Sequence, residues 1–222
     1  MALTWDQTGE RLYETGTDHG VLYPQSANGT YGTGVAWNGL TKVTESPDGA
    51  EETALYADNS KYLSLLSAEN FKGTIEAYTY PDEFAVCDGS AQVAEGVTVS
   101  QQPRTPFAMS YRTLVGNDTE ANNHGYKIHL VWGAKVSPSE RAYETVNDTP
   151  AALSFSWAFT TTPVDIGGDF QKSATMVIDS TTADKTALAA LEAKLYGGDG
   201  DAQPTMPTPQ EVLEMFKKTT AP

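Results

Sequence analysis

The sequence predicts a mainly β fold in which short strands are joined by turns. Twelve prolines and 19 glycines punctuate the chain, and β-branched and aromatic residues dominate the extended segments between them. Two segments alternate between large apolar and smaller or polar residues, as half-buried strands do. The chain has 222 residues, a length at which a single all-β domain is common. We therefore expect one main domain.

The two clearest strand signals lie in the second half of the chain. In residues 126–132 large apolar side chains occupy alternate positions and so share one strand face: Tyr126, Ile128, Leu130 and Trp132. In residues 154–160 bulky groups share one face and small groups the other: Phe155, Trp157 and Phe159 against Ser154, Ser156, Ala158 and Thr160. The second strand is thus expected to have a packed side and a smooth side.

The first part of the chain is expected to contain little regular structure. Residues 1–34 are rich in glycine and weakly patterned, which predicts an N-terminal arm with at most one short strand. Residues 35–45 favour an extended segment that stops at a turn sequence, Ser46-Pro47-Asp48-Gly49. The acids and turn formers that follow predict a solvent-exposed loop over residues 46–59.

A strand is expected over residues 74–80, which contain β-branched and aromatic residues and no internal breaker. A short helix should follow it, since Pro81 suits a first helical position and Gly89 suits a C-terminal cap. Cys87 falls on this helix and is expected to be buried. Residues 175–179 predict another strand.

Two helices are expected near the C-terminus. Residues 183–196 place leucines three and four positions apart and are followed by Gly197, so the main β domain is expected to cover residues 1–197. Residues 198–222 predict a flexible linker and a short helix that opens with the capping box of Thr208 and Glu211. The apolar face of this docking helix could pack on its own core or on a neighbouring copy: Val212, Leu213, Met215 and Phe216.

The charge balance and the motif search disfavour several function classes. The chain has 29 acidic and 14 basic residues and a net charge of −15, which opposes binding to DNA. With one cysteine, Cys87, it cannot form an intrachain disulfide. No nucleophile, base and orienting group form a recognisable catalytic pattern, and no metal-binding spacing occurs. We expect neither an enzyme nor a cofactor, and, without a run of about 18 apolar residues, no membrane partner.

Four ordered segments carry a family resemblance. They are GTIEAYTYPDEF at 73–84 with CDG at 87–89, SYRTLVGNDT at 110–119, HGYKIHLV at 124–131, and PSERAY at 138–143 followed by VND, FSW and TTPV up to residue 164. These segments resemble the major tail proteins, or tail tube proteins, of siphophages that infect mainly Gram-positive bacteria. The resemblance extends over roughly residues 30 to 197.

The resemblance implies a virion protein that is assembled in the host cytoplasm. Its fold would be a tail-tube-type β-sandwich or partial barrel with one flanking α-helix. Subunits would form hexameric rings with a continuous inner β-barrel, and stacked rings would conduct DNA without binding it specifically. The implied partners are further copies of the chain, a tape measure protein, a tail terminator and a distal tail protein. The loop at 46–59 would join stacked rings through Pro47, Asp48, Gly49, Glu51 and Glu52.

An acidic lumen would repel DNA phosphates and ease their passage, although the sequence leaves open which acids face inward. Two alternatives remain. One is a β-sandwich adhesin or carbohydrate-binding module, for which exposed tyrosines would supply the binding surface. The other is a secretion-system tube protein, which would share the tube architecture.

Overall fold

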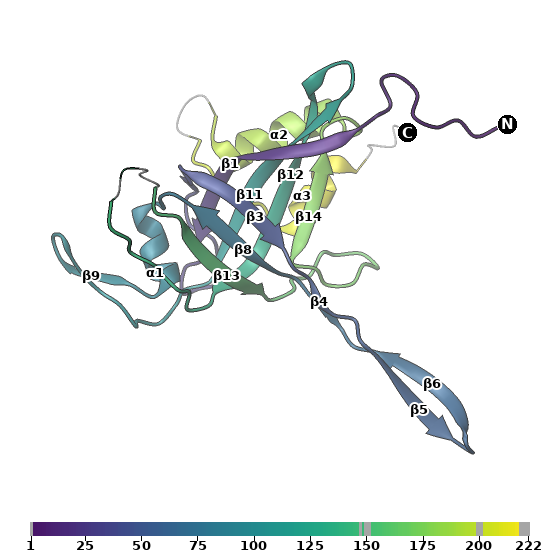
Figure 1. Ribbon diagram of the computed structural model, residues 1–222, viewed down its shortest axis with the longest axis horizontal. Helices are drawn as coiled ribbons and strands as arrows, with labels where there is room; N and C mark the ends of the chain where they lie inside the picture. The colour runs from purple at the N-terminus through teal and green to yellow at the C-terminus, as the bar shows by residue number, and fades with distance from the viewer. Residues whose placement is uncertain (1, 147, 149–151, 199–201, 218–222) are drawn as a thin grey trace.

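The computed structural model of the chain describes residues 2–146, 148, 152–198 and 202–217 (Figure 1). Its strands are β1 (Tyr13–Pro24), β2 (Val35–Ala36), β3 (Leu40–Glu45), β4 (Asp48–Gly49), β5 (Glu52–Ala57), β6 (Ser60–Leu66), β7 (Glu69–Asn70), β8 (Lys72–Ala77), β9 (Ala91–Ala94), β10 (Val97–Val99), β11 (Phe107–Asn117), β12 (Ala121–Val136), β13 (Phe155–Thr161) and β14 (Thr175–Asp179). Its helices are a 3-10 turn (Asp82–Phe84), α1 (Ala85–Asp88), α2 (Lys185–Tyr196) and α3 (Pro209–Phe216). The prediction of a mainly β protein is confirmed.

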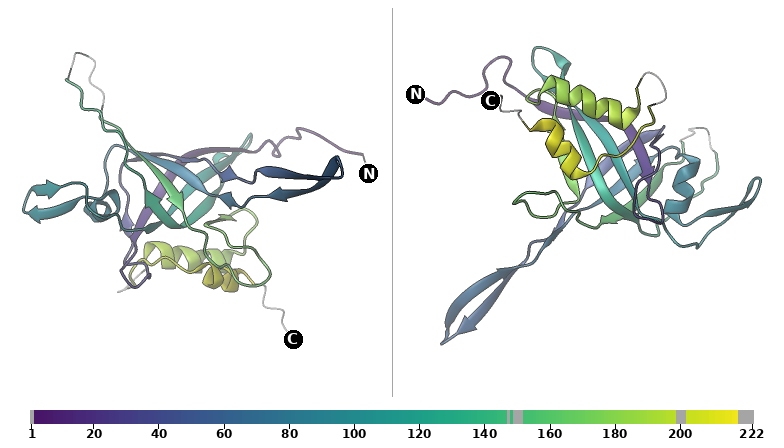
Figure 2. Two further views of the ribbon diagram at one scale, coloured as in Figure 1. Left: turned by 90° about the horizontal axis from the view of Figure 1, so that it is seen from below. Right: turned by 180° about the vertical axis from the view of Figure 1, so that it is seen from behind.

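One antiparallel sheet organises the molecule. Its strands follow the order β2-β1-β11-β12-β13-β8-β3, and β14 also pairs with β12. The long strand β12 pairs with β14 through residues 127–131 and with β13 through residues 134–136. The sheet curls, but in the described residues no ladder joins β3 to β1, so it stays open. An open, curled main sheet is therefore found where a β-sandwich or partial barrel was expected (Figure 2).

A bulge at Gly133 creates the bend in β12. Gly133 has φ +61°, and a Cβ on it would lie 2.6 Å from the carbonyl oxygen of Thr162. Before the bulge, Trp132 faces the helices, whereas after it Ala134 faces the inside of the curl. The extra residue thus redirects the strand from β14 to β13, as bulges do in bent sheets.

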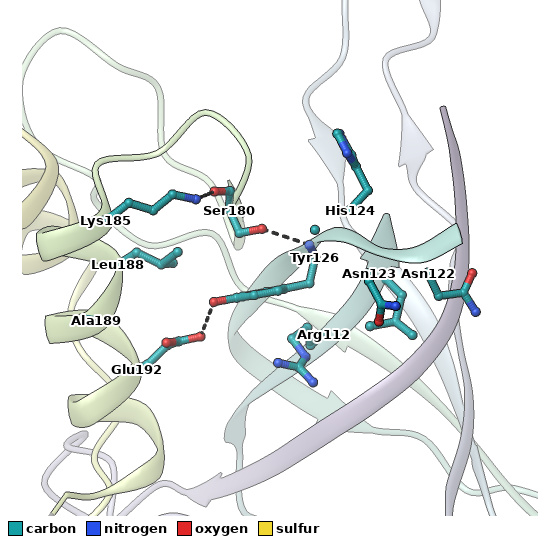
Figure 3. Close-up of a pocket in the computed structure, with 12 residues that line it drawn as sticks. Arg112, Asn122, Asn123, His124, Tyr126, Ser180, Lys185, Leu188, Ala189 and Glu192 are labelled. Atoms are coloured by element: carbon teal, nitrogen blue, oxygen red, sulfur yellow. Dashed lines mark hydrogen bonds between the residues drawn. The ribbon is translucent and has the colours of Figure 1, made fainter. Parts of the chain in front are cut away.

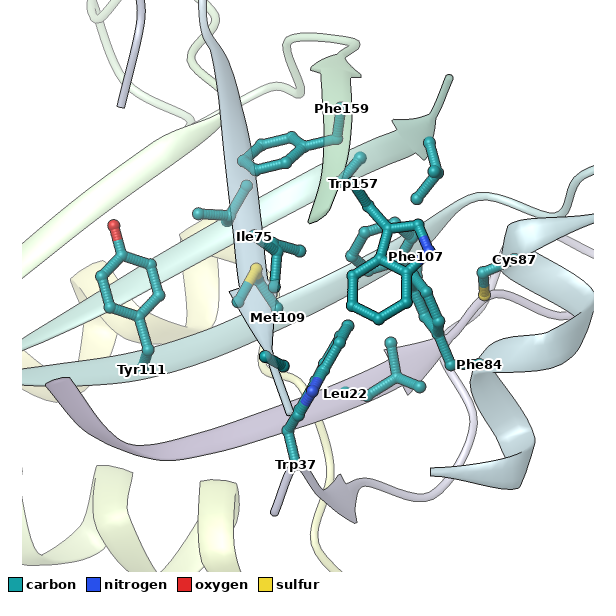
Figure 4. Close-up of a cluster of buried hydrophobic side chains, with 14 residues drawn as sticks. Leu22, Trp37, Ile75, Phe84, Cys87, Phe107, Met109, Tyr111, Trp157 and Phe159 are labelled. Carbon is teal, nitrogen blue, oxygen red and sulfur yellow. The ribbon is translucent and has the colours of Figure 1, made fainter. Parts of the chain in front are cut away.

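The inside of the curl holds the larger aromatic core (Figure 4). Phe84 lies at its centre, with ring centroids 4.6 Å from Trp37 and 5.1 Å from Trp157. Trp157 and Phe159 are buried and Phe155 packs at the margin, so the predicted bulky face of residues 154–160 is confirmed. Cys87, on the short helix capped by Gly89 as expected, is also buried here.

The outer face of the sheet carries a second core beneath α2 and α3. The predicted alternation of residues 126–132 is confirmed, because Ile128, Leu130 and Trp132 all point into this core. The helix expected at 183–196 begins at Lys185, and its N-cap Asp184 accepts hydrogen bonds from two backbone amides. The Tyr23 hydroxyl donates to the carbonyl of Leu195 at 2.7 Å, which ties the end of α2 to the sheet.

The expected N-terminal arm is largely wrong. Residues 13–24 form the twelve-residue strand β1, and Leu22 and Tyr23 are fully buried. Glycines favour this strand where neighbours come close: a Cβ on Gly20 would lie 2.8 Å from Leu40 Cδ2. Only residues before β1 extend from the body as an arm (Figure 1).

The C-terminal segment is part of the body, so the expected domain end at residue 197 is wrong. The α3 residue Val212 is only 1% exposed. Trp132 Nε1 donates to the carbonyl of Pro207 at 2.9 Å, and the Gly34 amide donates to the carbonyl of Pro204 at 2.8 Å. The docking helix therefore packs on its own chain, and α2 is not the only flanking helix. Of the expected linker and tail, residues 199–201 and 218–222 lie outside the described residues.

Among the described helices, none has the length and apolar character needed to cross a membrane.

Candidate functional site

The segment expected as a loop at 46–59 is the first half of a long β-hairpin. Strand β4 pairs with β7, and β5 pairs with β6. A two-residue turn at Asp58 and Asn59 closes it, with φ values of +51° and +58°. Residues 46–71, here called the hairpin arm, leave the sheet between β3 and β8 and project away from the body (Figure 1).

The residues predicted for the inter-ring loop lie in the base and the first strand of this arm. Glu52 accepts hydrogen bonds from Lys61 and Ser64 across the arm, and Lys61 lowers the pKa of this carboxyl. Asp48 pairs with Lys72, which likewise lowers its pKa. Pro47 and Glu51 are exposed, and Gly49 is half-buried.

Gly49 has a clear steric role in the base of the arm. It has φ +97°, and a Cβ on it would lie 2.3 Å from the carbonyl oxygen of Ala68 on the opposite strand. Only glycine lets the two strands come this close while adopting a left-handed backbone. The base is therefore a fixed junction between the sheet and the arm.

The main feature of the arm is its exposed apolar side chains, which were not predicted from the sequence. Tyr56, Tyr62 and Leu66 are 73%, 71% and 74% exposed. Leu55 lies opposite Leu63 in the register, on the other face of the ribbon. Apolar groups therefore lie on both faces. The available signal was the Asp58-Asn59 pair between two β-forming runs, a favourable hairpin turn.

Within the described residues, the two strands of the arm have neither a third strand nor a packing surface to support them. An isolated two-stranded hairpin is at best marginally stable in water, and a third strand or a packing surface normally supports it. In the described part of the chain, β5 and β6 pair only with each other. At roughly 3.3 Å per residue, the strand from residue 46 to 58 spans about 40 Å. Its tip therefore reaches well beyond the core.

The outward side of β13, β8 and β3 forms a second distinctive surface, here called the smooth face. Ser156, Ala158 and Thr160 are exposed on it, in agreement with the predicted smooth side. The register places Thr74 and Thr44 beside Ala158 across the strands. In the same way Lys135, Lys72, Lys42 and Glu76 lie on this side. Lys42 pairs with Glu76 at 3.0 Å.

A hollow of about 470 Å³ lies between α2 and the β11–β12 strands (Figure 3). Arg112 binds Asp18 through two hydrogen bonds of 2.7 and 2.9 Å, and the arginine lowers the pKa of that carboxyl. Tyr126 donates to Glu192 on α2 at 2.6 Å, and Lys185 bonds the carbonyl of Ser180. The polar groups of this hollow bond one another, so they fasten α2 to the sheet.

No group of three or more His, Cys, Asp and Glu side chains able to hold a metal ion occurs within the described ranges. The docking-helix residues lie together on α3, where Val212 is buried and three are half-buried: Leu213, Met215 and Phe216. They are thus separate from the hairpin arm. The structure does not bring the two predicted sites together.

Comparison with known protein-family models finds no match for this sequence, and comparison with curated protein sequences finds none.

Proposed function

We propose that this chain is a structural virion protein, the tail tube subunit of a siphophage. Copies form hexameric rings that stack into a non-contractile tube, and genomic DNA passes through the tube into the host cell. The tape measure, terminator and distal tail proteins of such a tail are its proposed partners. The proposal rests on the four resembling sequence segments and on the hairpin arm.

The observation that carries the proposal is the apolar surface of the hairpin arm. Leucine and tyrosine side chains on both faces of a two-stranded ribbon stand in solvent, a costly arrangement for an isolated subunit. A neighbouring copy that covers the ribbon would remove these side chains from water. Covering would also supply the packing that a lone hairpin lacks.

Free strand edges support ring formation. In the described residues β3 pairs only with β8, and β14 pairs only with β12, so each has a second edge without a strand partner. Unpaired edges are templates for strand addition from another chain. Pairing of such edges around a ring would produce the continuous inner barrel of the proposal.

The smooth face is our candidate for the wall of the lumen. Its side chains are small, and most of its charges are paired, Lys42 with Glu76 and Lys72 with Asp48. Lys135, at the margin of this face on β12, forms no salt bridge with a described residue. The acidic excess of the chain does not lie on this face. DNA would therefore slide along it because few side chains protrude and few charges are free, and net negative repulsion would play a smaller part than the composition suggests.

Electron microscopy of the purified protein tests the proposal. Hollow tubes or six-membered rings are expected, whereas compact monomers that bind glycans would favour the adhesin or carbohydrate-binding alternative. A secretion-system tube would give the same images, so incorporation into infectious phage tails separates the two tube functions.

A matched pair of variants tests the role of the arm. Tyr62→Ser removes an aromatic group that is 71% exposed on the arm, and Phe170→Ser removes one that is 69% exposed elsewhere. We expect shorter or absent tubes only for the first variant. Replacement of residues 47–70 by an Asn-Gly turn should also stop tube growth but leave the subunit folded, because the Ser46 amide and the Lys72 carbonyl already bond at 2.8 Å at the base of the arm. Tubes of unchanged length in both arm variants would contradict the proposal.

A further inference from the structure

Most cations of this acidic protein already pair with acids of the same chain. The pairs include Arg11 with Asp118, Lys127 with Glu14 and Lys194 with Glu211. Five of the described cations form no salt bridge with any described residue: Arg104, Lys135, Lys172, Lys185 and Lys217. Of these, Arg104 and Lys135 line the same hollow. Arg104 packs over Gly89 at the end of α1, and Lys135 lies farther along the same side of the molecule, beside Thr160 of β13.

Arg104 and Lys135 line one continuous depression, here called the basic groove. Two adjoining hollows of about 580 and 390 Å³ share Arg104, Gln102 and Pro138. The first hollow extends to Arg141 and Asp88, and the second extends to Lys135. Asp88 is the one acid among the lining residues, and Arg141 already pairs with it. The groove therefore has a net charge of about +2 on a protein of −15.

The Arg104 side chain is fixed by packing, but its buried Nε lacks a hydrogen-bond acceptor among the described residues. Its side chain packs over Gly89, where an added Cβ would lie 3.1 Å from Cγ and 3.2 Å from Cζ of the arginine. Its Nε is buried and has no hydrogen-bond acceptor among the described residues. A buried donor without an acceptor is uncommon and costly in native proteins. An arginine fork is the preferred partner of a carboxylate.

The hairpin arm carries the matching charge. Between residues 46 and 71 five acids stand against one base: Asp48, Glu51, Glu52, Asp58 and Glu69 against Lys61. Asp48 and Glu52 pair with lysines of the same chain. The other three acids of the arm form no salt bridge with a described residue. The tip of the arm lies at the opposite end of the molecule from α1, beside which Arg104 packs over Gly89 (Figures 1 and 2).

We propose that the basic groove receives the acidic hairpin arm of a second copy of this chain. The proposal rests on the proposed tube function and identifies the receiving surface for the arm. Because donor and receiver are different patches, the contact is head-to-tail and can repeat without limit, as an extending polymer requires. Carboxylates of the arm supply acceptors for Arg104 and Lys135.

Cross-linking of the full-length protein tests this contact. Ser60→Cys and Gln102→Cys are placed in one chain, so that one cysteine sits beside the arm tip, where Asp58 is kept, and the other in the groove. A short bismaleimide should then give a ladder of covalent oligomers on a denaturing gel. The native Cys87 is fully buried, and burial raises the pKa of its thiol to about 12, so it should not react. Ser60→Cys combined with Phe170→Cys is the matched control and should give no ladder.

Charge reversal then tests whether attraction between the groove cations and the arm acids forms the contact. Lys135→Glu, at an exposed position, and Arg104→Glu should together reduce ladder formation about tenfold, because attractive pairs become repulsive. Adding Asp58→Arg at the arm tip should restore the ladder. Lys135→Glu alone keeps the test informative if the Arg104 variant misfolds, which tryptophan fluorescence would reveal.

Each outcome decides between the two proposals. Tubes without a ladder would overturn the groove as the receiver and leave the tube function intact. A ladder without tubes would support the groove contact and contradict the tube function. If neither appears, both fail. Retention of duplex DNA by the wild-type protein and its loss in Arg104→Glu would assign the groove to nucleic acid and overturn the inference.

Discussion

Gly133→Ala should destabilise the protein more than the same change at another glycine with a similar backbone. Gly133 is the bulge residue that turns β12 from β14 to β13, and the path of the curled sheet depends on it. Its φ of +61° lies in the left-handed region. A methyl group there would also lie 2.6 Å from the carbonyl oxygen of Thr162, a backbone atom that cannot rotate away.

The cost has two parts. A residue with a Cβ in the left-handed region costs about 1–2 kcal/mol. Forcing a close contact in a packed strand adds about 1–3 kcal/mol, because the backbone must shift. The free energy of unfolding should therefore fall by about 2–5 kcal/mol in Gly133→Ala. That is a large share of the ordinary stability of a domain.

Gly168→Ala is the control. Gly168 has φ +65°, and its nearest neighbour would be Phe170 Cδ2 at 3.8 Å, an ordinary contact. This variant should lose only the backbone part, about 1–2 kcal/mol. Urea unfolding of the unassembled protein, followed by tryptophan fluorescence, measures both losses. Equal losses in the two variants would show that the close approach to Thr162 does not constrain the bulge, and the explanation of the bend would be wrong.

Three further predictions concern the packing and titration of the subunit. Val212→Ala should lower the free energy of unfolding by about 1–2 kcal/mol through lost burial and a small cavity, and the half-buried Leu213→Ala should cost less per methylene removed, as urea unfolding would measure. Because Arg112 lowers the pKa of Asp18 in the folded state, this carboxylate stabilises the fold above its ordinary pKa near 4, and that contribution is lost as the pH falls through the lower folded value. Asp18→Asn should therefore be less stable at neutral pH and show a shallower loss of stability in an acid titration below about pH 4. Cys87 should react with a thiol reagent at pH 8 only after unfolding, since its pKa is raised to about 12, and rapid reaction of the native protein would contradict its burial.

The strands that the sequence predicted well are those whose two sides differ. In residues 154–160, Trp157 and Phe159 are buried while Ser156 and Ala158 are exposed. The pattern of residue types therefore follows the pattern of burial with a period of two. The same holds for Ile128 to Trp132 on the side of β12 that faces the helices. For these two strands the sequence alone therefore indicates which side is buried.

The hairpin arm could not be predicted in this way because neither of its sides packs on the subunit. Leu55, Leu63 and Leu65 alternate with Tyr62 and other exposed residues, so apolar groups occur on both sides without a core to define the period. The acids at its start suggested a loop. If a second copy covers the arm, the packing that would explain its sequence belongs to the assembly, which a single chain does not contain.

Strand β1 was missed for a different reason. Gly16 and His19 both adopt positive φ, and the pairing of β1 with β11 shifts at two places between Thr15 and Val21. These irregularities break the alternation that identifies a strand. The glycines of this segment suggested an unstructured arm. In the structure Gly20 instead allows the strand to bend past Leu40. A composition rule cannot distinguish the two cases without the neighbouring strand.

The distribution of charge, more than its total, decides whether copies of this chain can meet. At physiological ionic strength the Debye length is about 8 Å, so a net charge spread over the whole surface acts weakly between distant patches. Groups in direct contact are screened much less. Asp48 and Glu52 already pair with lysines in the arm, which lowers the repulsion that an approaching acidic surface would meet. The acids still free on the arm and the unpaired Arg104 of the groove then favour one orientation of approach. An acidic subunit can thus stay soluble and still associate in a defined direction, because solubility depends on the sum of its charges and docking depends on their local arrangement.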